Sequence, residues 1–150
     1  MEKRGIRNNN PLNIRRGASN WVGLKEKQTD KEFCQFVSMS YGFRAAFRLV
    51  FNYIRFSGLK TVREIINRWA PTEENPTKEY LYFVCGKGGF KPDYEIFDKD
   101  DIPRSCLMNL VWYMAVFESG KGIFKYTIEF EMGYNLFVES LKKWDKNRIS

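Results

Sequence analysis

The sequence predicts one mainly helical α+β domain over residues 1–150, with a single small β-hairpin. Most of the chain beyond residue 40 places apolar residues three and four positions apart, which is the period of an amphipathic helix. Residues 21–37 differ, because two short apolar runs there flank a charged segment, as the strands of a hairpin do. The chain is 43% hydrophobic, with aromatic residues alone at 17%, so it can bury a core without disulfides or metal ions.

The net charge indicates the kind of partner, and the cysteine spacing indicates whether disulfides are present. Twenty-five basic and eighteen acidic residues give a net charge of +7, which favours anionic partners such as nucleic acid, a membrane surface or an anionic cell wall. Cys34, Cys85 and Cys106 are odd in number and lie far apart, so we expect buried free thiols and no disulfide framework. We expect neither a metal ion nor a cofactor.

The N-terminus and the apolar runs predict where the protein is made. The first residues lack the apolar segment of a secretory signal peptide. The longest apolar run, residues 106–117, is too short to span a bilayer. We therefore expect a soluble protein that is made in the cytoplasm.

The predicted hairpin pairs residues 21–24 with residues 33–37, and the charged segment 25–32 connects them. A long helix follows over residues 41–56, with Ser40 as its N-cap and Ser57-Gly58 as its end. One stripe of this helix is apolar and predicts its buried face: Ala46, Leu49, Val50, Tyr53 and Ile54.

Two shorter helices are expected next. Thr61 caps the first of them, because Glu64 completes a capping box, and Pro71 ends it. Its apolar face is Val62, Ile65, Ile66 and Trp69. Thr77 caps the other, which ends in the glycine cluster 86–89. This cluster follows a helix and lacks the GxxxxGK[ST] pattern, so it does not predict a phosphate-binding loop.

The most apolar helix is expected between Asp100 or Asp101, as the N-cap, and Gly120. We expect it to be the central helix, with Leu107, Leu110, Val111 and Met114 among the most buried residues. Residues 123–132 alternate in character and predict a strand or an extended connector. A closing amphipathic helix then carries Leu136, Phe137, Ser140, Leu141 and Trp144 on one side.

The N-terminal stretch 4–17 is rich in arginine, asparagine, glycine and proline, which favour turns over helices and strands. Composition leaves two alternatives open. The stretch is either a disordered basic arm or an ordered loop whose amides and guanidinium groups line a polar cleft.

A family resemblance favours the ordered loop. Residues 4–15 read Arg-Gly-Ile-Arg-Asn-Asn-Asn-Pro-x-Asn-Ile-Arg, and Gly42-Phe43-Arg44, Trp69-Ala70-Pro71 and Asn75-Pro76-Thr77 follow in order. This pattern, over roughly residues 4–120, resembles phage and prophage structural (virion-associated) proteins of lysozyme-like, peptidoglycan-cleaving type. Two positions depart from the family: Leu12 replaces its usual glycine, and Phe117-Glu118-Ser119-Gly120 replaces its usual His-Glu-Asn-Gly.

The resemblance implies a lysozyme-like fold. In lysozyme-like enzymes the helix that carries the catalytic glutamate precedes an asparagine-rich segment. Here the asparagine-rich segment comes first, which is the motif order of a circular permutation.

Glu118 is the candidate catalytic residue. It follows Met114 and Val111 on the apolar face of its helix, and it ends that helix, where the helix dipole disfavours a carboxylate. Both effects raise a pKa, as general acid catalysis of glycosidic cleavage requires. Glu118-Ser119-Gly120 also resembles the catalytic Glu-Ser-Gly of soluble lytic transglycosylases. The alternative is a peripheral glutamate frayed into solvent.

Six further residues are candidates for substrate binding. Polar side chains would bind sugar hydroxyls, acyl groups or peptide groups, and aromatic rings would stack on pyranose faces, although core packing is an equal alternative for each ring. The candidates are Asn10, Asn13, Arg15, Trp21, Asn75 and Tyr80. A second carboxylate would make the reaction hydrolytic, whereas a lone glutamate suits lytic transglycosylation. The sequence nominates no second carboxylate.

The sequence thus predicts a phage- or prophage-associated enzyme, of lytic transglycosylase or muramidase type, that cleaves peptidoglycan glycan strands. The alternative is a non-catalytic phage structural or cell-wall-binding protein with the same fold. Expected partners are glycan strands and other virion proteins, and a virion or cell lysis would deliver the protein to the wall. Nucleic acid is not expected, because the basic residues are spread over the whole chain.

Overall fold

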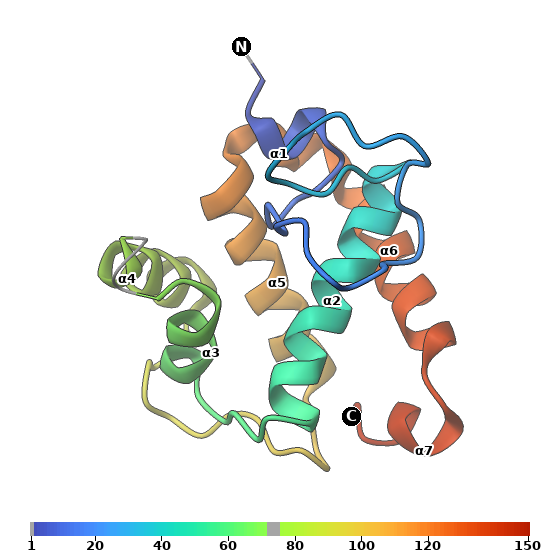
Figure 1. Ribbon diagram of the computed structural model, residues 1–150. Helices are drawn as coiled ribbons and strands as arrows, with labels where there is room; N and C mark the ends of the chain where they lie inside the picture. Colours follow the sequence, from blue (N-terminus) through green and yellow to red (C-terminus); the bar gives the residue numbers. More distant parts are fainter. Residues whose placement is uncertain (1, 72–75) are drawn as a thin grey trace.

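The computed structural model describes residues 2–71 and 76–150, and these residues form a helical protein (Figure 1). No β-strand occurs among them, and four isolated bridges are the only β-type pairings that they contain. The elements in order are α1 (Arg4–Arg7), α2 (Met39–Arg55), α3 (Val62–Trp69), α4 (Thr77–Gly88), α5 (Arg104–Ser119), the 3₁₀ helix η1 (Lys121–Tyr126), α6 (Thr127–Ser140) and α7 (Lys143–Lys146).

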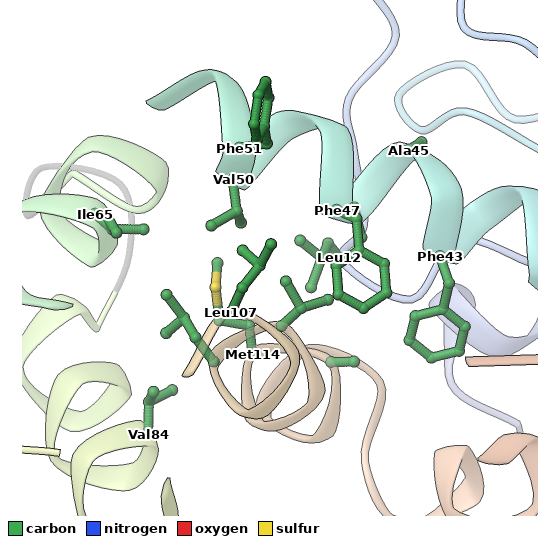
Figure 2. Close-up of a cluster of buried hydrophobic side chains, with 14 of the residues drawn as sticks. Leu12, Phe43, Ala45, Phe47, Val50, Phe51, Ile65, Val84, Leu107 and Met114 are labelled. Atoms are coloured by element: carbon green, nitrogen blue, oxygen red, sulfur yellow. The ribbon is translucent and has the colours of Figure 1, made fainter. Parts of the chain in front are cut away.

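The core forms where α2 and α4 pack against α5 and where α6 packs against α2. Figure 1 shows α2 and α5 side by side, with α6 behind α2 and the α3–α4 pair on the opposite flank. Figure 2 looks nearly along α5 and shows side chains from α2, α3 and α4 meeting around it. One buried cluster includes Phe47 and Val50 of α2, Ile65 of α3 and Val84 of α4. The prediction of α5 as the central helix is confirmed, because Leu107, Leu110, Val111 and Met114 have no exposed surface.

The α+β class and the β-hairpin are wrong. Residues 33–37 do not pair with one neighbour for long enough to form a strand, because three different segments accept their backbone amides. Cys34 N–H donates to the carbonyl of Ile14, and Phe36 N–H donates to that of Asn8. Val37 N–H donates to the carbonyl of Gly23, the one bond of these three that belongs to the expected hairpin. The result is a loop with isolated bridges at Arg15–Phe33 and Leu24–Phe36.

Several helix ends differ from the predicted ones. Helix α2 begins two residues early, because Ser38, not Ser40, accepts the bond from the amide of Tyr41. The N-cap of α5 is Pro103, and Asp100 and Asp101 lie in a preceding turn closed by hydrogen bonds between Asp98 and Asp101. The N-cap of α4 is Pro76, so Thr77 lies inside the helix.

Other predicted boundaries are confirmed. Thr61 and Glu64 form the capping box of α3, since each side chain bonds the backbone amide of the other. Gly120 ends α5 with a φ of 75°, in the left-handed region that favours glycine.

The region after α5 is helical, so the predicted strand or connector at 123–132 is wrong. Its buried residues, Phe130, Gly133, Tyr134 and Phe137, follow the helical period on α6. The expected closing helix is divided, because α6 ends at Ser140 before the short α7 begins.

Helices α2 and α6 approach so closely that Gly133 has no room for a side chain. A Cβ there would lie 2.5 Å from Cβ of Phe43 and 2.8 Å from the carbonyl oxygen of Ser40. The pair is reinforced by edge-to-face contacts, such as that of the Phe43 and Phe130 rings, with centroids 5.1 Å apart.

Gly133→Ala should therefore destabilise the fold by about 1–3 kcal/mol through overpacking, measured as the free energy of unfolding in urea. Gly86→Ala is the matched control, because Gly86 is an exposed helical glycine with no atom within 4 Å of its Cβ position. That control should stabilise the protein by up to about 1 kcal/mol through helix propensity. Equal effects of the two substitutions would contradict a close α2–α6 crossing.

Candidate functional site

The candidate site lies at the C-terminal end of α5, where the N-terminal loop meets it. Glu118 is half-buried in the last turn of the helix, and the next residue, Ser119, is fully buried. The Ser119 hydroxyl donates to the carbonyl oxygen of Pro11 at 2.7 Å. Gly5 of α1 permits this approach, since a Cβ at that position would lie 2.3 Å from Oγ of Ser119. The end of α5 is thereby fixed to the loop.

Donors from three distant segments surround the Glu118 carboxyl. The Trp69 indole Nε1–H, at the end of α3, donates to Oε2 at 2.8 Å. The Asn13 amide Nδ2 in the loop donates to Oε1 at 3.4 Å and to the Glu118 backbone carbonyl at 3.3 Å. Tyr80 of α4 also interacts with the carboxyl and lowers its pKa. The carboxyl is therefore oriented by groups outside its own helix.

The local backbone explains how two of these donors reach the carboxyl. Asn13 has a φ of 54°, a left-handed conformation that asparagine tolerates better than most residues. Tyr80 is buried, and its ring stacks on that of Phe117 with centroids 4.1 Å apart. Its hydroxyl also lies 3.4 Å from the backbone carbonyl oxygen of Met114.

The environment of Glu118 favours its protonated form. Burial is the largest effect and raises the pKa of Glu118, while the bonds from Trp69, Asn13 and Tyr80 and the charge of Arg15 lower this pKa in part. The net pKa lies above the ordinary value of 4.5. Burial and the nearby Glu118 charge also raise the pKa of Tyr80 well above its usual value, so the phenol keeps its proton.

Some of the predicted substrate-binding residues lie near Glu118, and the others do not. Asn13 and Tyr80 interact with the Glu118 carboxyl, and Arg15, two residues beyond Asn13, acts on it through its charge. Asn10 is fully buried, and its amide donates to the carbonyls of Ile14 and Cys34, so it shapes the loop from inside. Trp21 is half-buried and packs against the core. Asn75 lies outside the described residues.

Trp69 is the site residue that the sequence did not nominate. The sequence analysis assigned Trp69 to the apolar face of α3, and its ring does pack against the core. Its indole N–H, however, is the closest hydrogen-bond donor to the Glu118 carboxyl. A signal for it was present. Buried indole N–H groups usually find a polar partner, and Trp69-Ala70-Pro71 is one of the segments that carry the family resemblance.

The N-terminal loop is ordered by a second polar cluster behind the site. Asp30 accepts two bonds from Arg4, at 2.8 and 2.9 Å, and one from the Asn8 amide. The Arg4 guanidinium is the main cause of the strongly lowered pKa of Asp30. This ordered loop, and not a disordered arm, is what delivers Asn13 to Glu118.

A large cavity lies away from Glu118. It is a groove of about 970 Å³ beside the N-terminal half of α5, lined mainly by apolar groups such as Phe90, Met108, Trp112 and Phe130. No described residue group combines three or more potential metal ligands of the His, Cys, Asp and Glu types. In the described part of the chain, no helix is long and apolar enough to cross a membrane.

Glu118→Gln should stabilise the protein more at high pH than at low pH. A carboxyl whose pKa is raised in the folded state binds more protons when folded, so its ionisation lowers stability as pH rises from about 4.5 through the raised pKa. The amide does not titrate. Unfolding in urea at about pH 4 and about pH 8 measures the difference. A pH-independent difference between variant and wild type would contradict the burial of Glu118.

One comparison with known proteins gives the family of this chain. The chain is 36% identical over 144 residues to Protein P5 of Pseudoalteromonas phage PM2, and the match covers 93% of this chain and 78% of that protein. No family model matches the chain. The expectation of a phage protein, drawn from the N-terminal motif, is confirmed by this relative. The chain belongs to the phage protein family that includes Protein P5 of phage PM2.

Proposed function

We propose that the protein is a phage-associated enzyme that cleaves the glycan strands of peptidoglycan, with Glu118 as the general acid. The supporting observation is the state of this carboxyl. It is half-buried, its pKa is raised by burial, and its orientation is fixed by the 2.8 Å bond from Trp69. A protonated, oriented carboxylic acid that solvent can still reach is what protonation of a glycosidic oxygen requires.

The same donors would assist as the proton leaves. Glu118 would give its proton to the leaving oxygen while the bond from C1 of the sugar to that oxygen breaks, with positive charge developing at C1. The new carboxylate would then accept the bonds from Trp69, Asn13 and Tyr80. These donors are already in place, so stabilising the product carboxylate needs little rearrangement.

The reaction that we propose is lytic transglycosylation, because the hydrogen-bond partners of the Glu118 carboxyl among the described residues are neutral groups. Among the described residues, the side chains that hydrogen-bond the Glu118 carboxyl are neutral, and Arg15 supplies the largest charge effect on its pKa. A lone acid is sufficient when the C6 hydroxyl of the cleaved sugar attacks C1, gives its proton to the Glu118 carboxylate formed in the first step, and closes a 1,6-anhydro ring. Muramidase-type hydrolysis would need a second carboxylate to activate water or to attack C1.

The second candidate function is non-catalytic binding to the cell wall, as a structural component of a virion. It is favoured by Phe117, which stands where the resembling family usually has histidine and which stacks on Tyr80. In that case the cluster around Glu118 would bind sugars without cleaving them.

Glu118→Gln separates the two candidates. The amide keeps the shape and can accept the Trp69 bond, but it cannot supply a proton, so glycan cleavage should fall by about 10²–10⁴-fold with folding intact. Turbidity loss of purified peptidoglycan gives the rate, and mass spectrometry of the products distinguishes 1,6-anhydro ends from reducing ends. Glu139→Gln, an exposed substitution on α6, is the matched control. Wild-type protein that leaves several wall types intact but binds them would favour the second candidate.

Trp69→Phe should move the pH profile of cleavage. Removal of the indole N–H takes away a donor that lowers the pKa of Glu118, so this pKa should rise and the basic limb of the rate profile should shift to higher pH. The maximal rate should fall, because the product carboxylate loses its closest donor. Trp144→Phe, on exposed α7, should change neither quantity. An unchanged basic limb in Trp69→Phe would contradict the assignment of Glu118 as the titrating acid.

A further inference from the structure

We propose that Arg15 makes the site selective for glycan strands that carry stem peptides, by binding a peptide carboxylate beside the sugar at Glu118. This inference rests on the proposed location of the glycan site at Glu118, but it concerns recognition and not cleavage. It has four supports: the position of Arg15, the rigidity of its backbone, its weak pairing with acids, and the chemistry of its guanidinium.

Arg15 is placed beside Glu118 by the loop. It lies two residues beyond Asn13, whose amide contacts the Glu118 carboxyl, and directly after the buried Ile14. The positive charge of Arg15 also lowers the pKa of the Glu118 carboxyl. Its own side chain is 66% exposed. A substrate at Glu118 would therefore meet a solvent-facing cation at the rim of the site.

The backbone of Arg15 is held on both sides. The amide of Cys34 donates to the carbonyl of Ile14 at 2.9 Å, and the amide of Arg16 donates to the carbonyl of Glu32 at 2.8 Å. The Arg15 guanidinium also lies over the Phe33 ring, 5.1 Å from its centroid. These contacts limit the positions that the guanidinium can take before a ligand arrives, which reduces the entropy cost of binding.

The charge of Arg15 is only weakly paired. Its closest acid is Glu32, with 3.6 Å between Nη1 and Oε2, and that side chain is itself 55% exposed. An exposed ion pair of this length contributes little free energy. Arg4 shows the contrast, because it also lies over the Phe33 ring, 4.6 Å from the centroid, but makes two short hydrogen bonds to Asp30. Arg15 can exchange Glu32 for a ligand carboxylate, whereas Arg4 is committed to the fold.

A guanidinium recognises carboxylates through paired N–H donors, and it gains little from neutral sugar hydroxyls. The stem peptides of peptidoglycan carry carboxylates close to the glycan backbone, whereas unsubstituted amino-sugar polymers are neutral. Arg16 is also exposed, but its guanidinium donates to the backbone carbonyl of Asp30. The substrate class indicated by Arg15 is therefore a peptide-bearing, anionic glycan strand.

The test measures binding to a protein that cannot cleave. The Glu118→Gln variant is titrated calorimetrically with a tetrasaccharide–peptide fragment whose peptide carboxyl groups are either free or converted to amides. Addition of Arg15→Gln should weaken binding of the free-acid fragment about tenfold or more and leave the amidated fragment unaffected. Arg16→Gln in the same background is the control and should change neither affinity.

Each outcome decides the proposal. Equal loss for both fragments in Arg15→Gln would mean a general role in the loop, and no loss for either would mean no role, so both results overturn carboxylate recognition. Cleavage by the wild-type protein is measured separately on the same two fragments. Charge-dependent binding without cleavage would support the inference and refute the proposed enzymatic function. Cleavage without an Arg15 effect on binding would do the reverse, and absence of both binding and cleavage would refute both.

Discussion

The close approach of the N-terminal loop to two helices is the constraint on which the rest of the structure depends. At Gly42 of α2, a Cβ would lie 2.0 Å from the carbonyl oxygen of Asn9, and at Gly5 a Cβ would meet Ser119 at the end of α5. Only glycine permits backbone and helix to come this close at both positions. The loop can then place Leu12 in the core and Asn13 against Glu118 within a single turn of chain. A loop displaced outward by one side chain would lose both contacts together.

The asparagines of this loop have two structural roles, turn formation and side-chain hydrogen bonding. The composition of the loop does not show which asparagine has which role. Asn9 and Asn13 adopt positive φ, which reverses the chain direction where other side chains would be strained. Asn8 and Asn10 are buried, and their amides replace backbone pairing by bonding Asp30 and the carbonyls of Ile14 and Cys34. The loop is thus ordered by side-chain amides where a β-hairpin would use a ladder of backbone bonds.

The sequence predicted those parts of the fold that depend on local patterns. The capping box at Thr61 and the apolar period of α5 depend on residues three or four apart, and both were found. The hairpin failed because the amide partners of residues 34–37 lie on three segments, which no local pattern reveals. The first part of α6 was missed because apolar residues at 124, 126, 128 and 130 alternate with other residues, which is also the period of a strand. At the site, the position of Glu118 followed from its own helix, but its Trp69 partner lies 49 residues away.

The sequence separation of the groups around Glu118 has a consequence for the order of events during synthesis. Asn13 and Glu118 are 105 residues apart, and Trp69 lies between them. A ribosome-bound chain that has emerged only as far as α4 already contains the loop, the indole and the phenol, yet it lacks the acid that they orient. The pKa of Glu118 is set by burial among these groups, so the acid acquires its chemical character only when α5 docks beneath the loop. A chain that has been synthesised only as far as α4 therefore lacks this buried carboxyl, and the site is complete only after α5 has packed against the loop.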